Sequence, residues 1–154
     1  MDIASIIKPD AVKLISAASS KKRLFQELAE IGSNVYGVCP KNTLAALQER
    51  ETLGPTGVGN GIALPHARVN DLTEVAGAFM RLEKPLDFDA VDRQPIDLVF
   101  ALFAPEQSGV DHLKALAVVS RTMRDPAVCT KLRANTSPAI LHAILTETPS
   151  IKAA

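Results

Sequence analysis

Apolar residues recur at helical spacing in the first third of the chain. Residues 21–38, KKRLFQELAEIGSNVYGV, follow two serines and predict an amphipathic helix with Ser20 as its N-cap, because apolar side chains recur every three or four positions at Leu24, Phe25, Leu28, Ile31 and Val35. A second, shorter helix is expected over 43–53, TLAALQERETL, capped by Asn42 and ending before Gly54 and Pro55.

The middle of the chain alternates between glycine-rich and apolar segments. Residues 54–68, GPTGVGNGIALPHAR, predict a loop that leads into a short strand over Ile62–Leu64. A second strand is expected over 75–82, VAGAFMRL, and a polar connection over 84–94, KPLDFDAVDRQ. The near-continuous apolar run over 95–105, PIDLVFALFAP, is typical of a strand buried on both faces.

The last third of the chain predicts helices only. Ser108 is expected to cap a helix over 109–123 whose buried face holds Leu113, Leu116, Ala117, Ser120 and Met123. Asp125-Pro126 and Ser137-Pro138 each place a capping residue before a proline, which favours the start of a short helix. The last four residues are expected to fray.

A few strands flanked by pairs of helices indicate an α/β protein. No internal repeat or linker divides the sequence, so residues 1–154 are interpreted as one domain. We expect a three-layer α/β/α architecture, with a mixed central sheet between two layers of helices.

Composition excludes several classes of function. The 17 basic and 17 acidic residues cancel, which argues against nucleic-acid binding and against a polybasic membrane anchor. No apolar run approaches the roughly 18 residues that a membrane span needs, and the N-terminus does not resemble a signal peptide. Cys39 and Cys129 lie far apart and form no metal-binding pair. These features favour a cytoplasmic protein that does not insert into a membrane.

The segment with the clearest chemistry ends at His66. Gly59, Asn60 and Gly61 allow a tight turn whose exposed N–H groups are suited to an anion, and Pro65 stiffens the backbone before His66. The spacing matches neither a dinucleotide-binding motif nor a P-loop. Such a turn also has a purely structural interpretation, which is the commoner one for glycines taken alone.

A neutral histidine can accept a phosphoryl group on a ring nitrogen. His66 is therefore the candidate nucleophile, because a histidine with an ordinary pKa of about 6.5 is largely neutral at pH 7. Phosphoryl transfer also needs donors and cations around the phosphate oxygens. The candidates are Asn60 in the glycine loop, Arg50 near the end of the second helix and His112 in the first turn after Ser108. Two of these residues also have interpretations without a role in phosphate binding: Arg50 as a solvated surface charge and His112 as an exposed residue of the helix. His142, among apolar residues in the last helix, is interpreted as structural.

Three segments resemble the fructose/mannitol class of enzyme IIA domains of the bacterial phosphoenolpyruvate phosphotransferase system. They are 48–68 (QERETLGPTGVGNGIALPHAR), 88–105 (FDAVDRQPIDLVFALFAP) and 111–117 (DHLKALA), and the resemblance extends over most of the chain, in particular to the stand-alone nitrogen-regulatory branch. It implies that His66 is phosphorylated, on Nε2, that Arg50 and His112 assist, and that Asn60 corresponds to the family's asparagine. Ala67 stands where glycine is common, for which a small local adjustment is expected.

The resemblance also implies partners. The donor would be a small HPr-like phosphocarrier, and the phosphorylation state would control binding to regulatory targets such as sensor kinases or potassium-uptake proteins. No cofactor or metal is expected, because the phosphoramidate donor is already activated.

Three other functions remain open at this point. A sugar-specific enzyme IIA would pass the phosphoryl group to a IIB domain and its permease. A non-catalytic binding module would have a degenerate site, although the joint presence of Arg50, Asn60, His66 and His112 argues against it. A metal hydrolase using His66 and His112 would need a third ligand, which the spacing does not supply.

Overall fold

The computed structural model describes residues 1–147 of the chain. Positions 148–154 of the predicted domain, and with them the expected fraying of the last four residues, fall outside the described range. In chain order the elements are η1 (Ile3–Ser5), η2 (Pro9–Ala11), β1 (Val12–Ile15), α1 (Lys21–Tyr36), α2 (Pro40–Thr52), β2 (Gly57–Gly59), β3 (Ile62–Ala63), β4 (His66–Val69), β5 (Ala76–Leu86), β6 (Ile96–Pro105), α3 (Gly109–Met123), α4 (Pro126–Arg133) and α5 (Pro138–Thr146).

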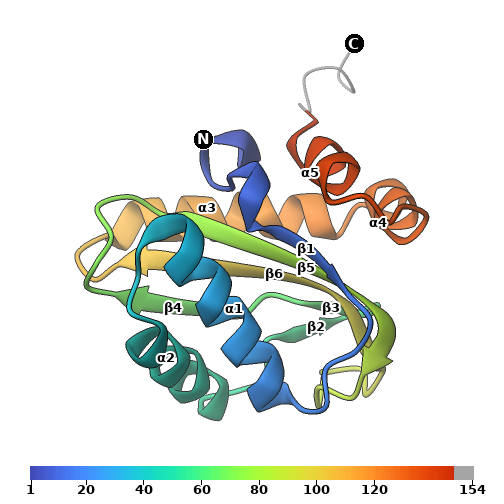
Figure 1. Ribbon diagram of the computed structural model, residues 1–154, viewed down its shortest axis with the longest axis horizontal. Helices are drawn as coiled ribbons and strands as arrows, with labels where there is room; N and C mark the ends of the chain where they lie inside the picture. The colour runs from blue at the N-terminus through green and yellow to red at the C-terminus, as the bar shows by residue number, and fades with distance from the viewer. Residues whose placement is uncertain (148–154) are drawn as a thin grey trace.

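The sheet is built around β6. One edge of β6 pairs antiparallel with β5, and β5 pairs parallel with β1. The other edge of β6 pairs parallel with two short strands in succession, β3 and then β4 (Figure 1). The hairpin partner β2 lies antiparallel to β3 at the outside. The predicted mixed sheet is therefore confirmed.

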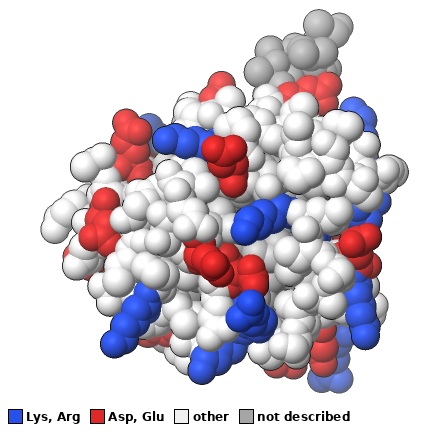
Figure 2. Space-filling model, viewed as in Figure 1, with Lys and Arg blue, Asp and Glu red and all other residues white. Residues whose placement is uncertain are grey.

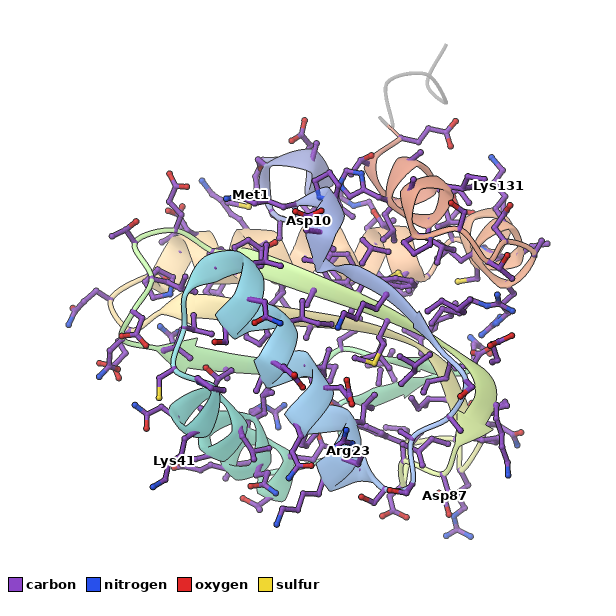
Figure 3. All side chains as sticks on the ribbon, viewed as in Figure 1. Met1, Asp10, Arg23, Lys41, Asp87 and Lys131 are labelled. Carbon is purple, nitrogen blue, oxygen red and sulfur yellow. The ribbon has the colours of Figure 1, made fainter. Side chains whose placement is uncertain are left out.

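Helices cover both faces of this sheet. Helix α1 crosses in front of the sheet with α2 beside it, and α3 runs behind it (Figure 1). Arg23 and Lys41, labelled in Figure 3, mark the beginnings of α1 and α2. An ion pair of 2.9 Å between Lys21 Nζ and Glu51 Oε2 joins the start of α1 to the end of α2. The three-layer α/β/α architecture is confirmed.

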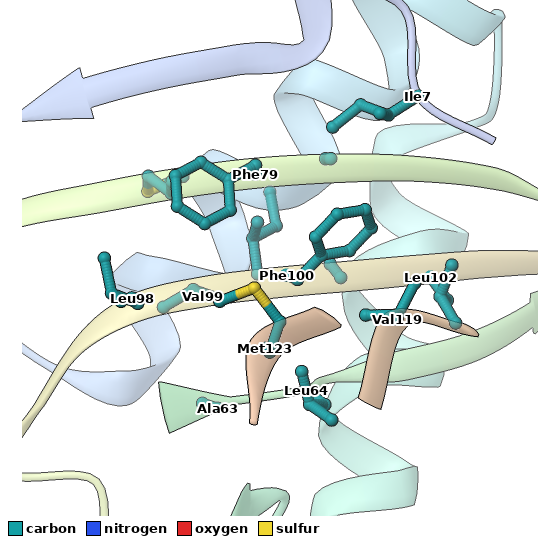
Figure 4. Close-up of a cluster of buried hydrophobic side chains, with 14 of the residues drawn as sticks. Ile7, Ala63, Leu64, Phe79, Leu98, Val99, Phe100, Leu102, Val119 and Met123 are labelled. Atoms are coloured by element: carbon teal, nitrogen blue, oxygen red, sulfur yellow. The ribbon is translucent and has the colours of Figure 1, made fainter. Parts of the chain in front are cut away.

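The core fills the space between these layers. Phe79 of β5 and Phe100 of β6 meet edge to face with ring centroids 6.2 Å apart. Figure 4 shows Val119 and Met123 of α3 among the side chains of the same buried cluster. Burial on both faces explains why the sequence of β6 is almost continuously apolar. Charged side chains of both signs are interspersed over the face in Figure 2.

Two predicted boundaries and three missing strands need correction. Helix α2 begins at Pro40 with Cys39 as the N-cap, so Asn42 lies inside the first turn; proline is well suited to the first helical position because it lacks the N–H that would stay unpaired there. Strand β5 continues to Leu86, into the expected polar connection. Strands β1, β2 and β4 were not predicted; the four residues of β4 include both His66 and Arg68 and show no apolar run.

The buried face of α3 also differs from the prediction. His112, Ala115, Val119 and Met123 are buried, whereas Leu113 is 65% exposed. The run from Ala115 to Val119 is apolar throughout, so its periodicity does not single out one face.

The other four predicted caps stand at the expected helix starts but act differently. Ser20 accepts a hydrogen bond from the Arg23 amide, and Asp125 accepts one from the Ala127 amide. Ser108 instead donates its hydroxyl proton to the Pro105 carbonyl at 2.8 Å, and the Ser137 side chain makes no capping bond. Within residues 1–147, none of the helices is long and apolar enough to span a bilayer.

Candidate active site

His66 is the first residue of β4 and is half-buried. The strand register places it opposite Leu102 of β6, and the preceding carbonyl, that of Pro65, accepts a hydrogen bond of 2.9 Å from the Leu102 amide. The backbone on which the ring stands is therefore held on the central strand. Ala67 continues β4 opposite Phe103, and its φ angle is not positive. Alanine therefore fits at this position, where glycine is common in the family, without backbone strain.

Hydrogen bonds fix the protonation of the His66 ring. Nδ1 lies 3.1 Å from the Leu64 carbonyl oxygen, which can only accept, so Nδ1 carries the proton. Nε2 accepts a hydrogen bond of 3.0 Å from Arg50 Nε and therefore presents its lone pair. This is the neutral tautomer whose Nε2 is nucleophilic.

Arg50 reaches the ring from the last turn of α2. Its Nη1 donates to the Gly54 carbonyl at 3.0 Å, while its Nε points at His66. The guanidinium is thus held between the loop that follows α2 and the imidazole. A planar group with several fixed donors is well suited to phosphate oxygens.

His112 brings a second imidazole to the site from the first turn of α3. Its ring centroid lies 5.6 Å from that of His66, with the two rings tilted by 49°. The residue is 7% exposed, and its Nδ1 finds no hydrogen-bond partner among the described residues. A buried polar atom without a partner is uncommon in folded proteins, which distinguishes His112 from an ordinary core residue.

The surroundings keep both rings neutral near pH 7. Burial is the main cause that lowers the pKa of His66; the hydrogen bond to Leu64 raises that pKa, and the charge of Arg50 lowers it. Burial also lowers the pKa of His112, with smaller contributions from His66 and Arg68. Two neutral imidazoles beside two arginines make a pocket that is attractive to a phosphoryl group.

These residues surround one open pocket of about 350 Å³. Its lining consists of Ala46, Glu49, Arg50, Leu53, His66, Ala67, Arg68 and His112. The structure thus brings together three of the predicted residues, Arg50, His66 and His112. His142 lies elsewhere, with Nε2 3.1 Å from the Ile7 carbonyl oxygen, which fits its structural interpretation.

Arg68 is a pocket residue that sequence reasoning missed. It follows His66 by two positions in β4, so both side chains stand on the same face of the strand. Its Nη1 lies 3.3 Å from the Glu106 carbonyl oxygen and 3.4 Å from that of Ser108, just before α3. The period-two spacing from His66 is the signal that could have found it, had β4 been recognised as a strand.

The structure does not bring Gly59, Asn60 and Gly61 to this pocket. The β6 partners of Ile62 and His66, Leu98 and Leu102, are four residues apart, which is roughly 13 Å at about 3.3 Å per residue. Asn60 lies beyond Ile62 and borders a separate hollow of about 440 Å³. Its placement does not support the predicted contact with the phosphoryl group.

The glycine loop is instead a tight hairpin turn. Asn60 and Gly61 have positive φ angles of 58° and 79°, the combination that a two-residue turn between β2 and β3 requires. The Asn60 amide donates to Asp92 Oδ2 at 3.0 Å, and the Asn60 carbonyl accepts from Arg133 Nη2 at 2.7 Å. The structural interpretation of these glycines is the one that the geometry favours.

Replacing Gly61 with alanine is expected to destabilise the fold without slowing phosphoryl transfer. An added Cβ would meet Arg133 Nη2 at 2.7 Å and Asp97 Oδ1 at 2.8 Å, at a φ that alanine rarely adopts. We expect a loss of about 1–3 kcal/mol in the free energy of unfolding, measured by urea denaturation. A transfer rate reduced tenfold in the folded variant would contradict the separation of this turn from His66.

The lowered pKa values predict a loss of stability in mild acid. Below about pH 6.5 the unfolded chain binds protons at these histidines more readily than the folded chain, so the free energy of unfolding falls as the pH falls. Urea denaturation at pH 7.5 and pH 5.5 measures this. Carboxylates also change the stability over this pH range, and the double variant His66→Gln/His112→Gln measures their contribution alone. Between pH 7.5 and pH 5.5 it should lose less stability than the wild type. Equal losses in the two proteins would show that the pKa values are not lowered.

Comparison with known proteins gives this pocket its context. Residues 5–148 match the family described as "Phosphoenolpyruvate-dependent sugar phosphotransferase system, EIIA 2". The chain belongs to this family. Membership in the EIIA 2 family makes the protein a phosphocarrier component of a phosphotransferase system.

Two nitrogen regulatory proteins are similar to this EIIA 2 protein over nine tenths or more of their length. A nitrogen regulatory protein of Bradyrhizobium diazoefficiens is 40% identical over 153 residues, which cover 99% of this chain and 100% of the relative. The nitrogen regulatory protein of Escherichia coli K12 is 35% identical, covering 96% and 91% of the two chains. These names fit a regulatory role.

Solved structures agree with the fold of this EIIA 2 protein. The crystal structure of the nitrogen regulatory protein IIA-Ntr from Neisseria meningitidis has a TM-score of 0.85 at 32% identity, covering 94% of this chain and 99% of that one. The mannitol IIA of Escherichia coli shares the fold, with a TM-score of 0.74 at 21% identity, over 90% and 97% of the two chains. Within residues 1–147, no group of three or more His, Cys, Asp and Glu side chains is arranged to hold a metal ion.

Proposed function

We propose that this protein accepts a phosphoryl group on Nε2 of His66 from an HPr-like phosphohistidine protein. Its phosphorylation state then controls its binding to regulatory partners in the cytoplasm. The observation that carries the proposal is the pair of contacts on the His66 ring: Nδ1 is committed to the Leu64 carbonyl, and Nε2 presents its lone pair toward Arg50 in an open pocket.

The proposed step is a direct exchange between two imidazoles. The lone pair of His66 Nε2 attacks phosphorus and forms an N–P bond. The N–P bond of the donor breaks, and its electron pair returns to the donor's ring nitrogen. The proton stays on Nδ1, hydrogen-bonded to the Leu64 carbonyl, so the phosphorylated ring carries a positive charge. The donor ring, protonated on its other nitrogen, leaves as a neutral imidazole, and no base has to remove a proton from His66.

The pocket offers charge and donors to the transferred group. Arg50 must release Nε2 for the attack, and its guanidinium can then turn its donors to the phosphoryl oxygens. The His112 ring, with its centroid 5.6 Å from that of His66, is the candidate for a further contact with the phosphoryl oxygens. Preorganised donors of this kind act mainly by stabilising charge that develops in the transition state.

The rim of the pocket is suited to partner proteins. Leu53 lines the pocket and is 81% exposed, and Val110 and Leu113, close to His112 in the sequence of α3, are also exposed. A phosphoryl group on His66 would add close to two negative charges beside the exposed Leu53. Partners with different affinities for the two forms would therefore respond to it. The names of the relatives support regulatory targets, for which sensor kinases and potassium-uptake proteins are the candidates.

The test is reconstitution of the transfer with the wild-type protein. The chain is incubated with phosphoenolpyruvate, enzyme I and each candidate HPr-like carrier, and the labelled residue is mapped by mass spectrometry under alkaline conditions. Nitrogen-15 NMR then assigns the phosphorylated ring nitrogen. We expect one phosphoryl group per chain, on His66 Nε2. Label on another residue would refute the assignment, and no label with any carrier would indicate a binding module with a degenerate site.

A sugar-specific enzyme IIA is the second candidate. The fructose-specific EIIA component of Haloferax volcanii is 32% identical over 95% of this chain and 96% of its own. Its name gives that protein a sugar role that this chain could share. Rapid transfer from phosphorylated His66 to a purified IIB domain would favour this candidate over the regulatory one.

A further inference from the structure

A buried carboxylate lies next to the candidate active site without lining its pocket. Glu51 follows Arg50 in the last turn of α2, and its side chain is only 7% exposed. Its two oxygens accept three hydrogen bonds. Oε1 accepts from the Thr56 hydroxyl at 2.6 Å, and Oε2 accepts from the Thr56 amide at 3.0 Å and from Lys21 Nζ at 2.9 Å. Glu51 therefore fixes Thr56 by two bonds at once.

A chain of hydrogen bonds leads from Thr56 to the His66 ring. The Thr56 carbonyl accepts from the Leu64 amide at 2.9 Å. The Leu64 carbonyl in turn accepts from His66 Nδ1 at 3.1 Å, the contact that selects the tautomer. The position of the Leu64 carbonyl thus depends on the residue that Glu51 holds.

The loop held by Glu51 also reaches the other ring nitrogen. Residues 53–56 connect α2 to the β2–β3 hairpin and include Gly54, whose carbonyl accepts from Arg50 Nη1 at 3.0 Å. Arg50 donates from its Nε to His66 Nε2 at 3.0 Å. Both partners of the imidazole, the Leu64 carbonyl and the Arg50 guanidinium, therefore depend on this one short loop.

We propose that Glu51 is a positioning residue for the phosphoryl-transfer site: by fixing Thr56 and the 53–56 loop, it sets the tautomer of His66 and the placement of Arg50. The inference rests on the proposed function, in that the nitrogen left free by this tautomer is the phosphoryl acceptor. Glu51 makes no hydrogen bond to His66 and does not line the pocket, although its negative charge raises the pKa of His66.

The chemistry of the three donors explains why a carboxylate is needed. A backbone N–H, a hydroxyl and an ammonium all require an acceptor, and an ionised carboxylate is an acceptor at both oxygens. Glutamine would turn an N–H₂ group toward at least one of these donors. The ammonium of Lys21 is itself held 4.3 Å from the centre of the Phe88 ring, which ties the network to α1 and the core.

The test compares Glu51→Gln with matched variants. Thr56→Val removes the hydroxyl donor, Thr56→Ser retains it, and Glu27→Gln is the control because Glu27 also forms a helix ion pair, with Arg23 at 2.7 Å, on the exposed side of α1. The first readout is nitrogen-15 NMR of the His66 ring in the full chain at pH 7.5, without any phosphoryl donor. The second is the kcat and KM of phosphorylation by the phosphorylated HPr-like carrier.

We expect Glu51→Gln to shift the His66 ring toward a mixture of tautomers. Its kcat should fall about 10- to 100-fold, since small misplacements of a reacting group have effects of this size. The KM for the carrier should change less than threefold, because the exposed rim is untouched. Thr56→Val should change both readouts in the same direction, whereas Thr56→Ser and Glu27→Gln should resemble the wild type.

Wild-type nitrogen shifts and rates in folded Glu51→Gln would overturn the inference, because a purely structural role would lower the melting temperature and leave the ring unchanged. If Glu51→Gln does not fold, Thr56→Val decides between the same outcomes. If the wild type accepts no phosphoryl group, the proposed function fails, while the tautomer comparison still decides the role of Glu51.

Discussion

Replacing His66 with glutamine is expected to abolish phosphorylation by the HPr-like carrier. Glutamine can still accept a hydrogen bond from Arg50, but its amide nitrogen has no available lone pair with which to attack phosphorus. Loss of a nucleophile lowers transfer by on the order of 10⁴-fold or more. The measurement is incorporation of label from phosphoenolpyruvate through enzyme I and the carrier.

His142→Gln is the matched control for this experiment. It makes the same substitution at a half-buried histidine that lies outside the pocket, beside the Ile7 carbonyl. We expect it to be labelled like the wild type. An acid-labile phosphoryl group on the His66→Gln protein would show that the acceptor is another residue, and the mechanism proposed for Nε2 would then be wrong.

Replacing Arg50 with alanine is expected to slow phosphoryl transfer by about 10²- to 10³-fold, the range found when one preorganised donor to a developing charge is removed. The same change removes the donor that orients Nε2 and a positive charge that lowers the pKa of His66. That pKa should therefore rise, although burial still holds it down. Rapid-quench kinetics measures the rate, and NMR titration measures the pKa.

Arg50→Lys separates charge from geometry. Lysine keeps the positive charge, but a single ammonium cannot reproduce the fork that contacts both Gly54 and His66. We expect a rate between those of the wild type and Arg50→Ala. Arg23→Ala, on the exposed side of α1 (Figure 3), should leave the rate unchanged. A wild-type rate in Arg50→Ala would make Arg50 a bystander.

The sequence was informative where a residue's chemistry and its neighbours in the chain were enough. His66 after a proline, Arg50 at a helix end and His112 in a first turn could each be proposed from local sequence, and the structure brings all three to one pocket. The long apolar run of β6 likewise indicated a buried central strand. Local patterns of this kind depend little on what the rest of the chain does.

The sequence was misleading where the position of a side chain depends on contacts between segments far apart in the chain. Asn60 lies only six residues before His66 in the sequence, yet the hairpin turn carries it away along the edge of β6. Arg68 was missed because its side chain shares a face with His66 only if the segment is a strand. That strand, β4, pairs with residues of β6 more than thirty positions away in the sequence. The buried face of α3 could not be predicted, because the helix carries apolar residues on more than one side. Packing against the sheet determines which side is buried.

The break between β3 and β4 has a consequence for the reactivity of the protein. In an uninterrupted strand the carbonyl of Leu64 would be committed to a neighbouring main chain. Here the chain leaves the ladder at Leu64 and Pro65, so that oxygen is available to a side chain and takes the proton-bearing nitrogen of the imidazole. The irregularity in the sheet, and not an acidic side chain, therefore plays the part that an aspartate plays for the histidine of a hydrolase triad. Because a main-chain carbonyl has no charge to lose, its capacity to accept the Nδ1 proton does not itself change with pH.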